Sequence, residues 1–556
     1  MHVDARTIEE SRVLKSDLCL VGAGAAGITI ARALAGSSVE VCLLEQGGLE
    51  PSEETNAEPA IENEGLPYRS LPTAEDRRFG GATNRWGGLC APLDPIDFAE
   101  RAWVPHSGWP LDRSDLDPFY AEAQEVLQLG PYRYDPGYWA EAVNAYRPVL
   151  NGSSRLTNHV VQFSNAPFGR NGRPGTPREA TRLGEQYRPE LLEARNVTVV
   201  THATVTELRT PPSAATVSGL AVCGPGGTPF RAEADQYVLA AGGIENPRLL
   251  LDSDRHAPKG LGNEQDLVGR FFMESPHVPS ASLVLSSPQA LNAYRQDFSR
   301  VRAPLFQLGA TEEAQRDERI LNGYLRLDTR ASGIRSAQSL WRRLRSRAGK
   351  RDDAEPRREL RSIWEDPGGV AHGLRRALRN GEPTTHRFGR LNVLTIAEQA
   401  PNPDSRVTLS RERDAFGRRT ASLNWRLSAL DRRSVIRLNR LLDRELREAG
   451  QGHLRPADWL HEADEWRPDR SPEPSRYNTV REPSRFWGVR HYMGTTRMGD
   501  TPQNGVCDAN CRVYGLDNLY LAGSSVFPTT GGVPPTLTIV ALALRLADHL
   551  QDRAGG

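Results

Sequence analysis

A chain of 556 residues is too long for one ordinary hydrophobic core, so we expect two domains. Hydrophobic residues make up 38% and charged residues 25%, a composition typical of a globular protein rather than of a disordered one. Lysine plus arginine and aspartate plus glutamate both number 70, so no net field attracts nucleic acid or an anionic membrane, and the expected partner is a small molecule.

The N-terminal segment and the cysteines indicate a cytoplasmic protein. Residues 1–24 place acids where a secretory signal needs a basic start, and no apolar run precedes the first predicted strand. We find no run of roughly 18 apolar residues that would predict a transmembrane helix. The cysteines form no CxxC pair and have no histidine at metal-ligand spacing, so we expect reduced thiols and no metal site. They are Cys19, Cys42, Cys90, Cys223, Cys507 and Cys511.

The first motif is a glycine-rich turn between a strand and a helix. Residues 18–21 are apolar, as in a buried strand, and an amphipathic helix is expected to begin near Ala25. The turn between them follows the pattern GxGxxG. Gly22 permits the tight turn, Gly24 lets backbone N–H groups approach a pyrophosphate, and Gly27 lets the helix pack close to the strand. Alone, this pattern is weak evidence for a dinucleotide site.

A second strand that ends in an acid strengthens this interpretation. Residues 39–48, VEVCLLEQGG, place Glu45 18 positions after Gly27, where a carboxylate can accept a hydrogen bond from a ribose hydroxyl. The same carboxylate would repel a phosphate group on that ribose. The two strands therefore predict a dinucleotide without the extra phosphate, either FAD or NAD.

The following segments favour a flat ligand. Residues 77–98 hold four glycines within nine positions, which lets the backbone approach a flat ring closely. Farther along, residues 196–209 alternate as a strand does, and residues 237–251 run from a strand through AAGG into a helix. An asparagine in the glycine loop offers both a donor and an acceptor to a ring edge. The loop residues that we expect beside the ligand are Thr83, Asn84 and Trp86.

Together with the C-terminal part of the chain, these segments resemble the glucose-methanol-choline (GMC) oxidoreductases, FAD-dependent enzymes that mostly oxidise alcohols. The tail most resembles pyranose oxidases and their bacterial relatives, and the middle, roughly 280–390, matches nothing in particular. In the order of the family, the matching stretches are GAGAAG with Glu45, GGATNRWGG, HATVTEL, AAGGIENPRLLL, DLVGRFFME, HYMGTTRMGD, GVCDANCRVYGLDNLYLAGSSVFPTTGG and PPTLTIVALALRLADHL.

The resemblance implies an α/β fold, in which a Rossmann-type FAD-binding domain is interleaved with an α+β substrate-binding domain that contains an antiparallel sheet. A basic insertion at about 335–385 interrupts the second domain. It is interpreted either as a solvated helical insertion or as an amphipathic lid or docking face for an acidic partner or membrane surface. The expected FAD-binding domain comprises residues 1–110, 190–275 and 485–556, and the substrate-binding domain comprises 111–189 and 276–484.

The resemblance also assigns residues to the cofactor. The three glycines of the first turn would cradle the pyrophosphate of FAD, and Glu45 would hold the adenosine ribose. Arg85 stands where some members, especially pyranose oxidases, attach FAD through a histidine, so a non-covalent flavin is expected. Arg85 is otherwise interpreted as a partner of a phosphate or a carboxylate. The remaining assignments are the backbone of Val205 to adenine, Asn84 with its neighbours to the isoalloxazine ring, Gly523 and Ser524 to the phosphates or ribityl chain, and Pro535 and Thr536 at the start of the last helix.

The expected catalytic residue is His491. When a hydride leaves an alcohol, a base must take the hydroxyl proton, and histidine suits this role because its pKa lies near neutrality. In the family this base opens a glycine-containing loop, and HYMGTTRMG places His491 there, with Gly494, Thr495 and Met498 at the family's spacing.

The expected partner of this base is absent from its usual position. In family members the loop before the last helix has the sequence HANPTLT or a close variant. This chain has GGVPPTLT, so Gly532 and Pro534 stand at the positions of the histidine and the asparagine. Proline has no side-chain donor and no backbone N–H. Three outcomes are open: His491 acts alone, another polar residue such as Thr529, Thr530 or His277 stands in, or the reaction is not alcohol oxidation. His277 is otherwise interpreted as a structural histidine, and Glu398 as a buried partner of an arginine.

Three functions follow. The first is oxidation of a secondary alcohol of a sugar, glycoside or similarly polar alcohol, with oxygen or another molecule as electron acceptor. The second is a GMC-fold flavoenzyme with altered chemistry, such as oxidation at a C–H or C–N bond, a lyase reaction or a light-driven one, because Gly532 and Pro534 remove the usual partner. The third is a flavin-binding scaffold without catalytic activity.

Overall fold

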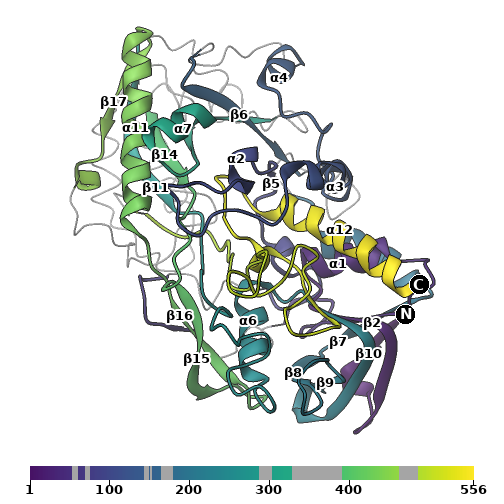
Figure 1. The fold of residues 1–556 in the computed structure, drawn as a ribbon. Helices are drawn as coiled ribbons and strands as arrows, with labels where there is room; N and C mark the ends of the chain where they lie inside the picture. The colour runs from purple at the N-terminus through teal and green to yellow at the C-terminus, as the bar shows by residue number, and fades with distance from the viewer. Residues whose placement is uncertain are drawn as a thin grey trace, which may run out of the picture.

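The computed structural model describes residues 1–52, 61–68, 76–142, 150, 153–164, 180–286, 304–328, 391–461 and 486–555. The basic insertion expected at about 335–385 lies outside these residues. Within the described part of the chain, no helix combines the length and the apolar character that are needed to cross a bilayer. The described residues form three sheets, and Figure 1 shows the two larger ones in different parts of the molecule.

The first sheet is assembled from stretches that lie far apart in the sequence. Its strand order is β1-β7-β3-β2-β10-β9-β8, and β18 also pairs with β10. All neighbours from β1 to β10, and the β10–β18 pair, are parallel, whereas β9 pairs antiparallel with β10 and with β8. The strands are β1 His2–Asp4, β2 Val13–Val21, β3 Val41–Leu44, β7 Val197–Thr201, β8 Thr204–Arg209, β9 Gly219–Cys223, β10 Pro229–Leu239 and β18 Leu519–Leu521.

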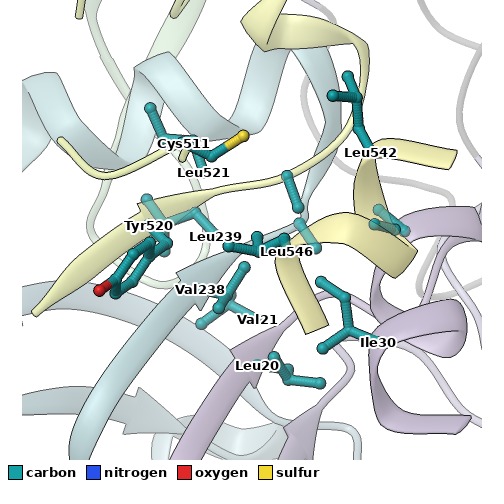
Figure 2. Packing of buried hydrophobic residues seen from close by; sticks show 14 of the residues in the cluster. Leu20, Val21, Ile30, Val238, Leu239, Cys511, Tyr520, Leu521, Leu542 and Leu546 are labelled. Carbon is teal, nitrogen blue, oxygen red and sulfur yellow. The ribbon is translucent and has the colours of Figure 1, made fainter. Parts of the chain in front are cut away.

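Helices bury the central strands of this sheet, which explains their continuous apolar runs. Cys19 and Leu20 of β2 are fully buried, as expected for a parallel strand that is covered on both faces. Helix α1, Ala25–Ala33, and helix α12, Thr536–Gly555, belong to the same apolar core. Figure 2 shows Leu546 of α12 close to Val238 and Leu239 of β10. Each of these apolar side chains gains about 1.5–3 kcal/mol from burial.

The second sheet is antiparallel throughout, with the order β17-β11-β14-β13-β12-β6-β5. Helix α11, Ala429–Glu448, covers one of its faces (Figure 1). A capping box between Ser428 and Asp431 begins this helix, and Leu438 and Leu442 pack against strand residues such as Leu325. The strands are β5 Leu89–Cys90, β6 Leu156–Phe163, β11 His277–Leu285, β12 Leu305–Ala310, β13 Gly323–Asp328, β14 Leu391–Ala397 and β17 Gly452–Pro456.

A small third sheet and shorter helices complete the described fold. The sheet joins β15 Arg406–Arg413 and β16 Arg419–Asn424 in an antiparallel pair, with β4 Glu62–Asn63 beside β16. The remaining helices are η1 Ala5–Thr7, η3 Gly81–Asn84, α2 Pro95–Phe98, α3 Arg113–Val126, α4 Pro136–Ala142, α5 Leu183–Glu193, η4 Pro225–Gly227, α6 Gly242–Asp252, α7 Glu312–Glu318, η6 Asp458–His461 and η8 Ser524–Val526.

These sheets confirm the expected fold class, a Rossmann-type parallel sheet interleaved with a part that contains an antiparallel sheet. The domain boundaries themselves stay predictions. Helix α3 falls in the range expected for the substrate-binding domain, yet it packs against α12, and Tyr120 Oη lies 2.9 Å from Thr538 Oγ1.

Candidate functional site

The glycine turn after β2 has the shape that its sequence predicts. Gly22 has a φ of +104°, and a Cβ at this position would lie 2.8 Å from the carbonyl oxygen of Ala240. A Cβ on Gly27 would clash with the carbonyl oxygen of Gly22, so the helix can approach the strand only with glycine here. A Cβ on Gly24 would meet nothing within 4 Å, which leaves open space at the N-terminus of α1. This open N-terminus suits a phosphate group.

Glu45 lies at the end of β3 beside this turn. Its carboxylate accepts hydrogen bonds from the backbone N–H groups of Ala23 and Gly47, both at 2.9 Å. Burial raises the pKa of Glu45, and the two backbone donors oppose that shift. A carboxylate has about four acceptor positions, so Glu45 can still accept a hydrogen bond from a ligand hydroxyl.

The glycine-rich loop lies against the first turn. A Cβ on Gly81 would lie 3.0 Å from Cα of Gly24, which places the two glycine-rich segments in contact. The buried Asn84 donates from Nδ2 to the carbonyl of Phe79 at 3.0 Å, and no described residue hydrogen-bonds to its buried Oδ1. Thr83 Oγ1 donates to the carbonyl of Gly80 at 2.6 Å. Asn84 therefore keeps a polar atom for a ligand, whereas Thr83 shapes the loop.

Two other loop residues have structural contacts. Trp86 is partly buried and donates from Nε1 to the carbonyl of Thr181 at 2.8 Å. Arg85 is exposed, and its Nε lies 3.2 Å from the carboxylate of Asp76. Arg85 therefore pairs with a carboxylate, which is one of the partners that the sequence suggested for it.

The remaining cofactor candidates lie at the ends of β8, β18 and α12. Gly523 follows β18 with a φ of +103°, and a Cβ there would meet nothing within 4 Å. Ser524 donates from Oγ to the carbonyl of Tyr492 at 2.7 Å. Val205 is less open, because its carbonyl accepts a 3.4 Å hydrogen bond from Arg418. Pro535 directly precedes α12, which begins at Thr536. The N-terminus of this helix therefore directly follows the loop that contains Gly532 and Pro534.

His491 is held by the segment that follows Met273. Its Nδ1 lies 3.2 Å from Ser275 Oγ, and its backbone N–H donates to Glu274 Oε1 at 2.9 Å. No other hydrogen bond of the imidazole occurs among the described residues, so Nε2 is available to a ligand. Burial lowers the pKa of His491 to about 4, which keeps the imidazole neutral at physiological pH.

Glu274 organises the loop that carries His491. Its fully buried carboxylate accepts hydrogen bonds from the hydroxyl of Tyr68 and from the backbone N–H groups of Ser275, Val489 and His491. Tyr68 in turn accepts from the backbone N–H of Arg490 at 3.0 Å. Burial raises the pKa of Glu274, and its donors lower it. We did not identify Glu274, Ser275 or Tyr68 from the sequence, although an acid among the apolar residues of FFME was a signal for the first.

The three proposed substitutes for the missing asparagine differ in their surroundings. Thr529 donates to the carbonyl of Asp97 at 2.6 Å and accepts from Trp109 Nε1 at 2.8 Å. Thr530 donates to the carbonyl of Gly531 and accepts from the backbone N–H of Gln399. Both threonines are fully buried, and their hydroxyls already have partners.

His277 is the third of these candidates, and it lies at the start of β11. Its backbone pairs with Trp487, four residues before His491. Its buried Nδ1 has no hydrogen-bond partner among the described residues. Burial lowers the pKa of His277 well below its usual value, and Arg326 and His491 add to that shift. His277 is therefore near the candidate base and keeps a polar atom free.

Glu398 has the structural role that the sequence favoured. It forms a fully buried ion pair with Arg101 through two hydrogen bonds of 2.5 and 2.8 Å, and it accepts a third from the backbone N–H of Asn322. The six cysteines are all unpaired thiols, and burial raises the pKa of Cys511 to about 12. Among the described residues, no cluster of histidine, cysteine and acidic side chains could hold a metal ion.

Comparisons with known proteins match the chain to FAD-dependent oxidoreductases. Residues 401–543 match the family model described as GMC oxidoreductase, and residues 17–261 match the model described as FAD dependent oxidoreductase. The fructose dehydrogenase large subunit of Gluconobacter japonicus is 24% identical over 97% of this chain and 98% of its own length. The 2-methyl-1,2-propanediol dehydrogenase of Mycolicibacterium austroafricanum is 25% identical over 97% of this chain and 96% of its own length. Pyridoxine 4-oxidase of Mesorbium loti shares the fold, with a TM-score of 0.54 and 17% identity over 96% of this chain and 98% of its own.

Proposed function

Because the chain belongs to the GMC oxidoreductases and is an FAD-dependent oxidoreductase, we propose that it oxidises a secondary alcohol of a sugar, glycoside or similarly polar alcohol, with His491 as the base. The observation that carries this proposal is the placement of the His491 imidazole, whose Nδ1 lies 3.2 Å from Ser275 Oγ and whose Nε2 has no hydrogen-bond partner among the described residues. One relative is named for a sugar and another for a diol, which supports a polar alcohol as the substrate class.

The described residues fit FAD. Gly24 and Gly523 both face open space, so the backbone of each leaves room for a phosphate or a ribityl chain. Glu45 has acceptor positions left for the adenosine ribose, and Asn84 Oδ1 is a buried acceptor without a partner among the described residues. Bound FAD supplies the hydride acceptor of the reaction. Arg85 cannot form the covalent bond that a histidine forms, so the flavin is held non-covalently.

The residues around His491 position its imidazole to accept the hydroxyl proton of the substrate. In the tautomer whose Nδ1–H donates to Ser275 Oγ, the lone pair of His491 lies on Nε2, where it takes the proton of the substrate hydroxyl. Glu274 fixes the position of this imidazole through the backbone N–H groups of Val489 and His491. Ser275 and Glu274 are thus positioning residues, and His491 is the catalytic residue.

A second candidate function rests on the loop before α12. Pro534 offers no hydrogen-bond donor, and the hydroxyls of Thr529 and Thr530 are engaged, so this loop does not stabilise a developing alkoxide as the asparagine of relatives is expected to do. Oxidation of a biosynthetic intermediate at a C–H or C–N bond needs no such donor. It is therefore the alternative to alcohol oxidation.

Anaerobic reduction of the bound flavin separates the two candidates. The purified protein is mixed with a panel of sugars, glycosides, aliphatic alcohols and amines, and bleaching of the flavin absorbance is followed. Reduction by polar alcohols supports the leading proposal. Reduction only by amines, or by none of the alcohols, would favour the second candidate. Acid precipitation that releases all the flavin into the supernatant would support non-covalent binding.

The rate of alcohol oxidation should depend on pH through His491. Because burial lowers the pKa of His491 to about 4, the base form predominates above that pH. We expect kcat/KM to be nearly constant between about pH 6 and 8 and to fall about tenfold per pH unit below about pH 4. Steady-state rates across this range, corrected for reversible loss of FAD, measure the profile. An inflection near pH 6.5, the ordinary pKa of histidine, would show that the base is not this imidazole.

Replacement of Glu274 by glutamine should slow catalysis more than it weakens substrate binding. The new amide NH₂ group would face backbone N–H groups that now donate to the carboxylate, so at least one of these hydrogen bonds would be lost. A hydrogen bond to a charged group contributes about 1.5–3 kcal/mol. We therefore expect kcat to fall about tenfold or more, with KM changed less than threefold and the flavin retained. The matched control is Glu312→Gln in α7, where the carboxylate is exposed. A variant with lower thermal stability but unchanged kcat would assign Glu274 a purely structural role.

A further inference from the structure

The place of the missing side chain at Gly532 is occupied by an aromatic ring. A Cβ added to Gly532 would lie 2.5 Å from Cε2 and 2.8 Å from Cδ2 of Tyr324. Two carbon atoms in contact lie about 3.5–4.0 Å apart, so no side chain fits at 532 while Tyr324 keeps its position. The change from histidine to glycine in this loop is therefore matched by a tyrosine from β13, which comes far earlier in the chain.

A second glycine makes room for the other edge of the ring. A Cβ added to Gly309 on β12 would lie 2.9 Å from Cδ1 of Tyr324 and 2.9 Å from the ring of His159. Because Gly309 has no side chain, the rings of Tyr324 and His159 meet across β12, with their centroids 4.3 Å apart. Tyr324 thus lies between Gly532 on one edge and Gly309 with His159 on the other.

The strand register places Tyr324 on the face of the sheet that is turned away from α11. Its neighbour Leu325 packs with the leucines of α11, whereas the fully buried Tyr324 packs with the core that includes α12. Tyr324 pairs with Ile396 on β14, which pairs with His277 on β11. Side chains at paired positions share a face, and neighbouring strands are about 4.8 Å apart, so Tyr324 and His277 lie on one face about 10 Å apart.

Polar atoms surround the hydroxyl of Tyr324. This hydroxyl donates to Asp94 Oδ2 at 2.5 Å, and the same carboxylate oxygen accepts from Asn322 Nδ2 at 3.0 Å. His159 Nδ1 lies 3.9 Å from Asp94 Oδ1, and no described residue hydrogen-bonds to the buried His159 Nε2. The single proton of Tyr324 is engaged by Asp94, and a phenol oxygen also accepts hydrogen bonds, so Tyr324 can serve a ligand as an acceptor.

We propose that Tyr324 is a substrate-binding residue that takes the space of the missing loop side chain and, with His159, binds hydroxyl groups of the substrate next to the one that is oxidised. This inference rests on the proposed function and narrows its substrate class to polyhydroxylated alcohols. Tyr324 accepts a hydrogen bond from one hydroxyl, and His159 Nε2 pairs with another. An aliphatic alcohol with a single hydroxyl makes neither contact, so these two residues favour sugars.

The substrate arm of the test removes only the tyrosine hydroxyl. Anaerobic flavin reduction is measured for the wild type, for Tyr324→Phe and for the control Tyr138→Phe, whose ring is exposed in α4. We expect the KM for polyhydroxylated alcohols to rise about tenfold in Tyr324→Phe, with the KM for 2-butanol and the flavin spectrum unchanged. The control should match the wild type. Equal KM values for sugars in Tyr324→Phe and the wild type would overturn the proposal.

The steric arm does not depend on activity. Gly532→Ala is expected to lower the melting temperature, and Tyr324→Ala should relieve the overlap, so that the double variant loses less than the sum of the two single losses. The control is Gly219→Ala in β9, where the nearest atoms lie at an ordinary 3.4 Å. Additive losses would show that Tyr324 does not fill the space at 532. If no alcohol reduces the wild-type flavin, the proposed function and the substrate-binding role of Tyr324 both fail. The melting temperatures of the steric variants would then still test whether Tyr324 fills the space at 532.

Discussion

His491→Ala should slow the reduction of bound flavin by a polar alcohol by about 10²–10⁴-fold, the usual contribution of a general base. His491 directly precedes Tyr492, whose carbonyl accepts a hydrogen bond from the cofactor candidate Ser524. The Nε2 of His491 has no partner among the described residues, and burial lowers the pKa of the imidazole to about 4, which leaves it unprotonated at neutral pH. Its side chain bonds only to Ser275 among the described residues, so its removal should leave the flavin bound. Stopped-flow absorbance under anaerobic conditions measures the rate.

The control for this variant is His256→Ala, which removes an exposed imidazole that contacts Thr210. That variant should reduce flavin at the wild-type rate. A His491→Ala enzyme that retains more than a tenth of the wild-type rate, with its flavin spectrum intact, would place the base elsewhere. His277 would then be the next candidate, because it lies near His491 and its Nδ1 has no described partner.

Glu398→Gln should reduce the free energy of unfolding by about 3–5 kcal/mol, because it leaves Arg101 charged and uncompensated in the interior. Both side chains of this pair are fully buried, and the pair joins the loop after α2 to the end of β14. Glutamine also places an N–H group opposite the guanidinium. Burial, and then the charge of Glu398, raise the pKa of the nearby Asp97, so removal of that charge in the variant should lower the pKa of Asp97.

Denaturant unfolding followed by tryptophan fluorescence measures this loss. The control is Glu207→Gln, which breaks an exposed ion pair with Arg255 and should cost less than about 1 kcal/mol. If the two variants have the same unfolding midpoint, the Arg101–Glu398 pair does not contribute to stability beyond an ordinary surface pair.

The elements around the cofactor could be predicted from short stretches of sequence. The apolar run of β2, the glycines at 22, 24 and 27 and the acid at 45 each report a local requirement, namely a strand buried on both faces, a turn with a positive φ and a carboxylate at a strand end. The resemblance to GMC oxidoreductases then predicted the cofactor and the fold class, and both are confirmed. The assignments of individual residues to FAD and to catalysis remain proposals.

The groups that position the base could not be predicted in this way. Glu274 and Tyr68 meet the segment 489–491 across more than 200 positions of the chain, and only the packing of the strands brings them together. The hydroxyls of Thr529 and Thr530 looked available in the sequence. In the structure their bonds to Asp97 and Gly531 engage both hydroxyls within the interior.

The sequence by itself predicted the glycine turn and the position of the candidate base, because these depend on residue types at fixed local spacing, and its resemblance to GMC oxidoreductases predicted the FAD cofactor and the fold class. Only the tertiary structure decided what stands beside Gly532. The ring of Tyr324 reaches that place because the register of β12, β13 and β14 sets which side chains share a face, and because glycine at 309 and 532 leaves the ring its space. Such contacts depend on the volumes of side chains and on the order and register of strands that are distant in the sequence, so no local sequence pattern predicts them.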